Sequence, residues 1–144
     1  MLKLNRETDY AIRVVLALAK YPPGSIIPSQ NIREEMDLPE ALSIQIISHL
    51  AHKNIIKTFP GRNGGIKLAK SPAEISLHDI VESIEGPIIL SECLQEGHYC
   101  DLSPSCPVQG RWIKLQTLFE QELKGISFED LIQDIPRWDI LDVQ

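Results

Sequence analysis

The chain has 144 residues and a formal net charge of −6 at pH 7, and 43% of its residues are hydrophobic. This length fits about one domain, and the apolar content is ample for a packed core. No apolar run approaches the roughly 18 residues of a membrane span, and the first residues lack the pattern of a signal peptide. We therefore expect a cytoplasmic protein.

The charge is unevenly distributed along the chain. Residues 1–70 contain ten Lys or Arg and six Asp or Glu, a net of +4. Residues 71–144 contain four Lys or Arg and fourteen Asp or Glu, a net of −10. Such asymmetry suggests that the first half faces an anionic partner, although two ordinary solvated surfaces would give the same split.

Apolar residues at helical spacing predict three helices in the first half of the chain. Their expected extents are from about Asn5 to before Pro22, from Gln30 to Met36, and from Pro39 to about His52. We expect Ser29 to be the N-cap of the second helix. The residues of the third helix that are expected to face the core are Leu42, Ile46, Ile47 and Leu50.

The second and third helices fit a helix-turn-helix, because a short turn joins them and the third shows polar side chains on its outer side. Plain helical packing is the alternative. The candidates for reading bases are Ser43, Gln45, Ser48 and His49, of which Gln45 suits adenine best. The candidates for holding phosphates are Ser29, Gln30, Lys53 and Lys57.

A β-hairpin is predicted directly after the third helix. Ile55–Phe59 alternates like a strand, Ile66–Leu68 returns, and Asn63-Gly64 between them is a strong hairpin signal. A hairpin at this place is a wing, and a narrow minor groove attracts an arginine at its tip. The wing residues that we expect to contact DNA are Arg62, Asn63 and Gly64.

The pattern of residues 71–144 predicts three further helices. One is expected from its N-cap Ser76 to Gly86, a long amphipathic one from Pro107 to about Lys124, and a short capped one over residues 127–132. A domain this small has little room to bury the long helix, so we expect it to pack against its own copy in a homodimer. A cover over the first helix of the same chain is the alternative.

All three cysteines lie between the fourth helix and the long helix. Cys93, Cys100 and Cys106 stand among Gly, Ser, Pro and acidic residues, which predicts a loop. Their spacing fits neither the step of most structural zinc sites nor a Cys-x-x-Cys redox pair. Three loosely spaced thiols can hold an iron–sulfur cluster if a fourth ligand comes from elsewhere. The alternatives are unligated thiols, zinc with His98, and a disulfide, which is the least favoured.

The sequence resembles the Rrf2 family of bacterial winged-helix transcription regulators, which includes an iron–sulfur cluster regulator and a nitric-oxide-sensitive repressor. The matching stretches are Thr8–Arg13, Ile27–Ser29, Leu38–Glu40, the wing Gly61–Ala69, Ile75–Pro87 and the three cysteines. The resemblance implies a mainly α fold: a winged helix-turn-helix with a β-hairpin wing and a long C-terminal dimerisation helix. It also implies a homodimer, a near-palindromic DNA operator and a 2Fe-2S or 4Fe-4S cluster.

The resemblance also implies a ligand set. By position, Cys93, Cys100 and Cys106 match the three thiolate ligands of the family, although the first gap is slightly longer than its commonest version. In one branch the fourth ligand is a histidine at the position where this chain has Gln109. In the nitric-oxide-sensing branch it is an aspartate from the first helix of the other subunit, which Asp9 matches. Asp9 in trans is therefore favoured, with His98 as the fallback.

The expected organisation is a DNA-binding domain over residues 1–86, a cluster-binding cysteine loop over 87–107, and a dimerisation helix with its tail over 108–144. The expected function is a transcription regulator, a repressor and redox sensor, whose operator affinity is switched by the cluster. No membrane, small-molecule substrate or enzymatic activity is expected. The first alternative is a cluster-free regulator that responds through cysteine oxidation or a partner protein, and the second is a small thiol enzyme.

Overall fold

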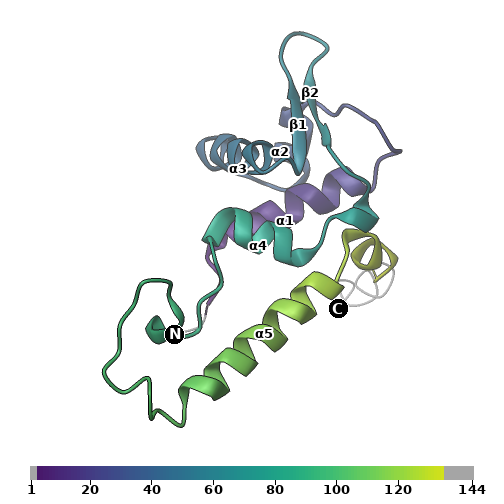
Figure 1. The fold of residues 1–144 in the computed structure, drawn as a ribbon. Helices are drawn as coiled ribbons and strands as arrows, with labels where there is room; N and C mark the ends of the chain where they lie inside the picture. Colours follow the sequence, from purple (N-terminus) through teal and green to yellow (C-terminus); the bar gives the residue numbers. More distant parts are fainter. Residues whose placement is uncertain (1–2, 135–144) are drawn as a thin grey trace, which may run out of the picture.

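The structure is a computed structural model, and it describes residues 3–134. Five α-helices, two short 3-10 helices and one antiparallel hairpin follow one another along this part of the chain (Figure 1). Their bounds are α1 Arg6–Ala19, α2 Ser29–Glu35, α3 Glu40–His52, β1 Ile56–Phe59, β2 Gly65–Leu68, η1 Pro72–Glu74, α4 Leu77–Glu85, η2 Glu92–Leu94 and α5 Gln109–Gly125. Residues 128–134 are also helical. Within residues 3–134, no helix is both long and apolar enough to cross a bilayer.

Helix α1 lies at the centre of the fold, and α2, α3, α4 and β2 all contact it. It begins at the predicted place because the Asn5 side chain accepts a hydrogen bond from the Thr8 amide at 2.9 Å. Its apolar stripe is buried almost completely, as the periodicity predicts. The core residues that complete it come from four other elements and include Ile32, Ile46, Leu50, Ile66 and Ile80.

The helix-turn-helix is present, but one of its predicted caps is wrong. Pro28 occupies the N-cap position of α2, so Ser29 is the first helical residue and no side chain caps this helix. The turn between α2 and α3 passes through Asp37 at a φ of +50°, and the Leu38 amide donates to the Arg33 carbonyl at 2.9 Å. Leu38 is buried, which anchors the turn to the core.

The wing projects from the body as an antiparallel hairpin (Figure 1). Phe59 pairs with Gly65, so residues 60–64 form a loop longer than a two-residue turn. Ile27, which precedes α2, exchanges two backbone hydrogen bonds with Ile66 of β2, at 2.9 and 2.8 Å. Gly65 permits this approach, because a Cβ atom there would lie 2.2 Å from the Ile27 carbonyl oxygen. The base of the wing is therefore fixed to the helix-turn-helix.

Helix α4 and the C-terminal helical segment confirm their predicted caps. Ser76 and Asp79 form a capping box at the start of α4, and Gly86 ends it with a φ of +81°. Ser127 and Asp130 form the same pattern before residues 128–134. The backbone and side-chain hydrogen bonds from Ser127 hold the pKa of Asp130 below its ordinary value.

Helix α5 runs below α4 and lies apart from the core (Figure 1). It begins two residues after the predicted Pro107 and includes Gly125, which was expected to stop it. None of its side chains is buried. Its C-terminal end is fixed to the body, because the Leu77 amide donates to the Ile126 carbonyl and the Phe128 amide donates to the Ile75 carbonyl, each at 2.9 Å.

Candidate nucleic-acid interface and cysteine segment

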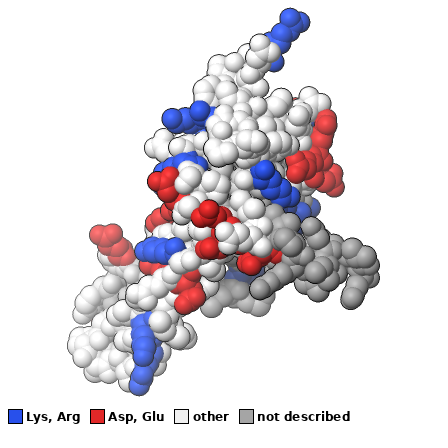
Figure 2. All heavy atoms as spheres, turned by 90° about the vertical axis from the view of Figure 1, so that its right-hand side faces the viewer, with Lys and Arg blue, Asp and Glu red and all other residues white. Residues whose placement is uncertain are grey.

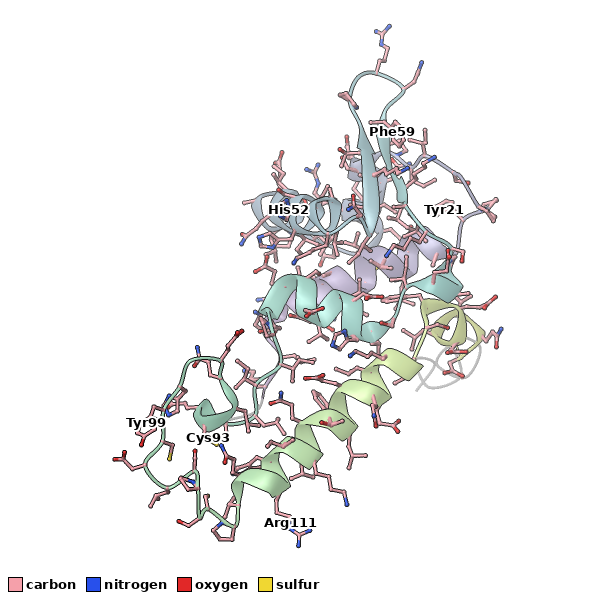
Figure 3. All side chains as sticks on the ribbon, viewed as in Figure 1. Tyr21, His52, Phe59, Cys93, Tyr99 and Arg111 are labelled. Atoms are coloured by element: carbon pink, nitrogen blue, oxygen red, sulfur yellow. The ribbon has the colours of Figure 1, made fainter. Side chains whose placement is uncertain are left out.

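One face of α3 is exposed to solvent. Spacings of three and four residues place Ala41, Ile44, Gln45, Ser48 and His52 on this face, and all five are exposed (Figure 3 labels His52). We call these five residues the outer face of α3. Gln45 and Ser48, which were predicted to read bases, therefore lie where that prediction needs them.

Two other predicted base readers lie elsewhere. Ser43 is only 4% exposed, because it shares the inner side of α3 with Ile46 and Leu50. Its hydroxyl donates to the Glu40 carbonyl at 2.7 Å, so it is satisfied within the helix. The prediction that Ser43 points outward is wrong. Sequence reasoning placed Ile44 on the outer side without giving it a role, and it missed His52, although the helical period counted from Ile44 and Ser48 would have found it.

His49 is half-buried and turns towards α1. Its Nδ1 atom lies 3.2 Å from Oε1 of Glu7 in the first turn of α1. The geometry is not that of a hydrogen bond, and both atoms are buried with no other polar partner among residues 3–134. His49 therefore faces α1 and does not belong to the outer face of α3.

The wing places basic side chains beyond the outer face of α3. Arg62 and Asn63 at its tip are exposed, as is Lys57 on β1. Figure 2 shows a basic side chain at the far end of the projecting wing, whereas acidic side chains gather on the body below it. Lys67 is engaged locally, since its Nζ atom lies 5.3 Å from the centre of the Phe59 ring.

A groove of about 560 Å³ lies between α2, α3 and the wing. It brings residues from three separate stretches of the sequence into one surface, and its lining includes Ser29, Gln30, Ile44, Thr58, Arg62 and Gly64. Gln30 is held in place by a 2.8 Å hydrogen bond from its amide to Glu34. Lys53 is exposed directly after α3. The predicted phosphate contacts Ser29, Gln30, Lys53 and Lys57 are therefore all exposed to solvent, but Lys53 lines a separate pocket with Asp79 and Glu82 of α4 and not this groove.

The cysteine segment, residues 87–108, connects α4 to α5 and has no regular structure except η2. It lies at the end of the molecule opposite the wing, where Figure 3 labels Cys93 and Tyr99. All three cysteines are half-buried and free of disulfide bonds. Three soft thiols are donors that suit an iron–sulfur cluster. Within the described chain, however, no three His, Cys, Asp or Glu side chains are close enough to hold a metal ion.

Within the described chain, neither Asp9 nor His98 gathers with two of the thiols. The Asp9 carboxylate is 57% exposed on α1 and lies 2.8 Å from the Arg13 guanidinium. Because such surface ion pairs contribute about 0–1 kcal/mol, opening this one for another partner costs little. His98 is exposed. The Gln109 amide donates to the Ser103 hydroxyl at 3.3 Å, which engages it within the segment.

The beginning of the cysteine segment is tied to α1. Glu85, the last residue of α4, accepts hydrogen bonds at Oε1 from the Asn5 amide at 2.7 Å and from the Thr8 hydroxyl at 2.5 Å. Thr8 is fully buried, and its neighbour in the sequence is Asp9. Sequence reasoning missed Glu85, because no local pattern joins residues 77 positions apart. Glu85, which closely precedes the cysteine segment, and His49 of α3 therefore both lie against the first turn of α1.

Helix α5 leaves a long apolar surface uncovered. Val108, Trp112, Leu115, Leu118 and Phe119 are each between 39% and 48% exposed. Three of them line a groove of about 600 Å³ together with Leu4 and residues 87–90. A contiguous apolar surface of this kind marks an interaction site on a soluble protein.

Comparison with known proteins decides the family. The model of the Rrf2 family, described as "Iron-dependent Transcriptional regulator", matches residues 4–134. The chain belongs to the Rrf2 family. It is similar to the HTH-type transcriptional regulator NsrR of Oceanobacillus iheyensis, with 29% identity over 92% of this chain and 91% of that protein. NsrR of Shouchella clausii is 30% identical over 91% of this chain and 89% of that protein.

A solved structure extends the likeness of this Rrf2 protein to the fold. CymR, the global cysteine regulator of B. subtilis, is 26% identical and superposes with a TM-score of 0.73, covering 92% of this chain and 98% of its own. The winged-helix fold predicted from the sequence is thereby confirmed. These relatives are named as transcription regulators, so at the level of the family this chain is a transcription regulator.

Proposed function

We propose that this Rrf2 protein is a homodimeric DNA-binding repressor whose affinity for a near-palindromic operator is switched by an iron–sulfur cluster. The observation that carries the DNA-binding part is the surface formed by the outer face of α3, the groove beside it and the basic wing. Gln45 and Ser48 contact bases in the major groove, and Arg62 enters the minor groove with Asn63 and Gly64 beside it. The phosphate contacts come from Ser29, Gln30, Lys53 and Lys57.

The second part of the proposal concerns the dimer. The uncovered apolar surface of α5 packs against the same surface of a second copy, as an isologous interface requires. Such a dimer places two copies of α3 on one side, and they enter successive major grooves when their centres are about 34–36 Å apart. The proposed organisation is residues 1–86 for DNA, 87–107 for the cluster and 108–144 for dimerisation, of which residues 135–144 lie outside the described part.

The third part concerns the cofactor. Cys93, Cys100 and Cys106 would hold the cluster, with Asp9 of the partner subunit as the fourth ligand. A carboxylate is a harder ligand than a thiolate, so this bond is the weakest of the four. A bound cluster supplies iron that reacts with nitric oxide, oxygen or reductants. The three thiols are not gathered in the described subunit, so the cysteine segment would have to bring them together to hold the group.

The switch follows from how the cysteine segment is attached. In the loaded state the segment is held to α1 of the partner subunit, which fixes the separation of the two copies of α3. In the unloaded state Asp9 would return to Arg13, and the segment would keep its attachments near Glu85 and through Leu90 to Gln116 of α5. A difference of a few kcal/mol in DNA affinity between the two states is enough to change promoter occupancy.

The test uses full-length protein purified without oxygen. Iron, acid-labile sulfide, visible absorption and native mass are measured for the wild type, Cys100→Ala and Ser105→Ala, an exposed residue of the same segment that serves as the control. We expect a coloured dimer for the wild type and Ser105→Ala, and a colourless protein for Cys100→Ala. Full iron and sulfide content in Cys100→Ala would refute the ligand assignment.

A cluster-free regulator is the second candidate, and the likeness to CymR, a regulator of cysteine, favours it. The three free, half-buried thiols are then the sensing groups themselves. An anaerobic wild-type protein that contains no iron, and whose operator binding changes reversibly on thiol oxidation, would establish this candidate. Its DNA interface is the same, so the proposed contacts of α3 and the wing stand in either case.

A further inference from the structure

Ile44 is the unusual member of the outer face of α3. Ile44 is 63% exposed, more than any other large apolar residue of α1, α2 or α3. The exposed polar residues Gln45 and Ser48 flank it, and it lines the groove between α3 and the wing together with Ser29 and Arg62. An apolar side chain therefore stands at the centre of the surface that meets DNA.

The major groove of DNA offers one apolar group on the base edges, the C5-methyl group of thymine. The other groups on the base edges are hydrogen-bond donors or acceptors, which a hydrocarbon side chain cannot satisfy, or single C–H groups such as C5–H of cytosine, which offer less apolar area. An isoleucine in this position therefore buries the most apolar surface against a thymine methyl group. The chemistry of the face thus favours thymine as the base that Ile44 contacts.

We propose that Ile44 is a specificity-determining residue that reads a thymine in each operator half-site by packing against its C5-methyl group. This inference rests on the proposed function, because it requires that the outer face of α3 enters the major groove. Gln45, the next residue, suits adenine, so the two neighbours together select adjacent A·T pairs. The dimer makes the contact twice, once in each half-site.

The experiment first selects an operator from a library of random DNA duplexes with the full-length anaerobic protein. Each thymine of the selected operator is then replaced, one at a time, by deoxyuridine, which differs from thymidine only in lacking the methyl group. Dissociation constants are measured at one fixed salt concentration for the wild type, Ile44→Ala, Ile44→Val and Ile26→Ala. Ile26 is a matched control, since it is 41% exposed and lies outside α3 and the wing.

At one thymine per half-site we expect loss of the methyl group to weaken binding of the wild type by about fourfold, and by about fifteenfold when both half-sites are changed. Ile44→Ala should bind the two operators equally, Ile44→Val should keep most of the difference, and Ile26→Ala should behave as the wild type. The inference is overturned if no deoxyuridine weakens binding, or if Ile44→Ala keeps the full difference. Failure to select any sequence would instead count against the proposed function.

Discussion

The bond between Thr8 and Glu85 allows a quantitative prediction about how the cysteine segment is attached. Replacing Thr8 by Val removes the hydroxyl that donates to Glu85 at 2.5 Å and keeps the shape of the side chain. Thr8 is fully buried, so the methyl group that replaces the hydroxyl fills the same space and leaves no cavity. The hydroxyl also lies 3.2 Å from the Asn5 side-chain oxygen, so the measured change reports its hydrogen bonds to Glu85 and Asn5 and not packing.

The expected magnitude follows from the partners of the carboxylate. A hydrogen bond to a charged group contributes about 1.5–3 kcal/mol to stability. Glu85 is exposed and keeps its second donor, the Asn5 amide at 2.7 Å, so water replaces part of what is lost. We expect Thr8→Val to lower the free energy of unfolding by about 1–2 kcal/mol, which corresponds to roughly 2–8 °C in the melting temperature of a protein of this size.

The assay is urea unfolding at one protein concentration, since a dimer unfolds in a concentration-dependent way. Thr117→Val is the matched control, because the Thr117 hydroxyl donates only to the Ile113 carbonyl on the exposed surface of α5. It should change stability by less than about 0.5 kcal/mol. Equal stabilities for Thr8→Val and the wild type would refute the reasoning that Glu85 fastens the segment to α1.

Three further predictions concern DNA, the dimer and pH. Arg62→Ala should weaken operator binding and lower the slope of log affinity against log salt by about one, whereas Lys124→Ala should change neither. Leu118→Glu should convert the dimer to a monomer in sedimentation without loss of helical signal, since Leu118 is 47% exposed. Asp130→Asn should lower stability at pH 6, and this difference should shrink as the pH is lowered through the folded-state pKa of the carboxyl, because the lowered pKa of Asp130 makes its contribution present above its ordinary 3.8 and lost on acidification. A difference that stays constant throughout the acid titration would contradict that assignment.

The sequence predicted a helix and its ends well where a capping residue and the spacing of apolar residues indicated the same boundaries. Ser76 with Asp79, followed by the period of α4 and by Gly86, defined that helix to the residue. The same reasoning failed for Ser29, because Pro28 has already fixed the entry of the chain into α2 and leaves no room for a side-chain cap. The general preference for serine at an N-cap is therefore overridden here by the backbone conformation of the residue before it.

The face of α3 could not be derived from polarity alone. Ser43 was expected outside because it is polar, but a serine in a helix can satisfy its hydroxyl on a preceding carbonyl, and this one does so with Glu40. Ile44 was placed on the outer side without a role, and it is indeed exposed there. Both sides of α3 contain an isoleucine and a serine, so the helical period predicts which residues are exposed better than side-chain polarity does.

The position of the cysteine segment relative to α1 and α5 could not be predicted from the sequence, because it depends on contacts between residues that are far apart in the chain. The position of the cysteine segment is set by Glu85 at its beginning and by the bond from the Leu90 amide to the Gln116 side chain of α5 at 3.0 Å. The first contact leads to the first turn of α1 and the second leads to the apolar surface of α5. No period or motif relates these positions to one another.

In the proposed switch, this double attachment is the route by which a change among the cysteines would reach the DNA. Helix α5 buries no side chain of its own, so its C-terminal end, its contacts with α4 and the cysteine segment fix its direction. The proposed dimer surface lies on that helix, and the helix-turn-helix is packed on α1. A rearrangement of the segment would therefore turn the proposed dimer surface relative to α3, and a small turn there would become a larger displacement at the wing. Two recognition helices that must match successive major grooves do not tolerate such a displacement, because a mismatch in spacing costs contacts in both half-sites.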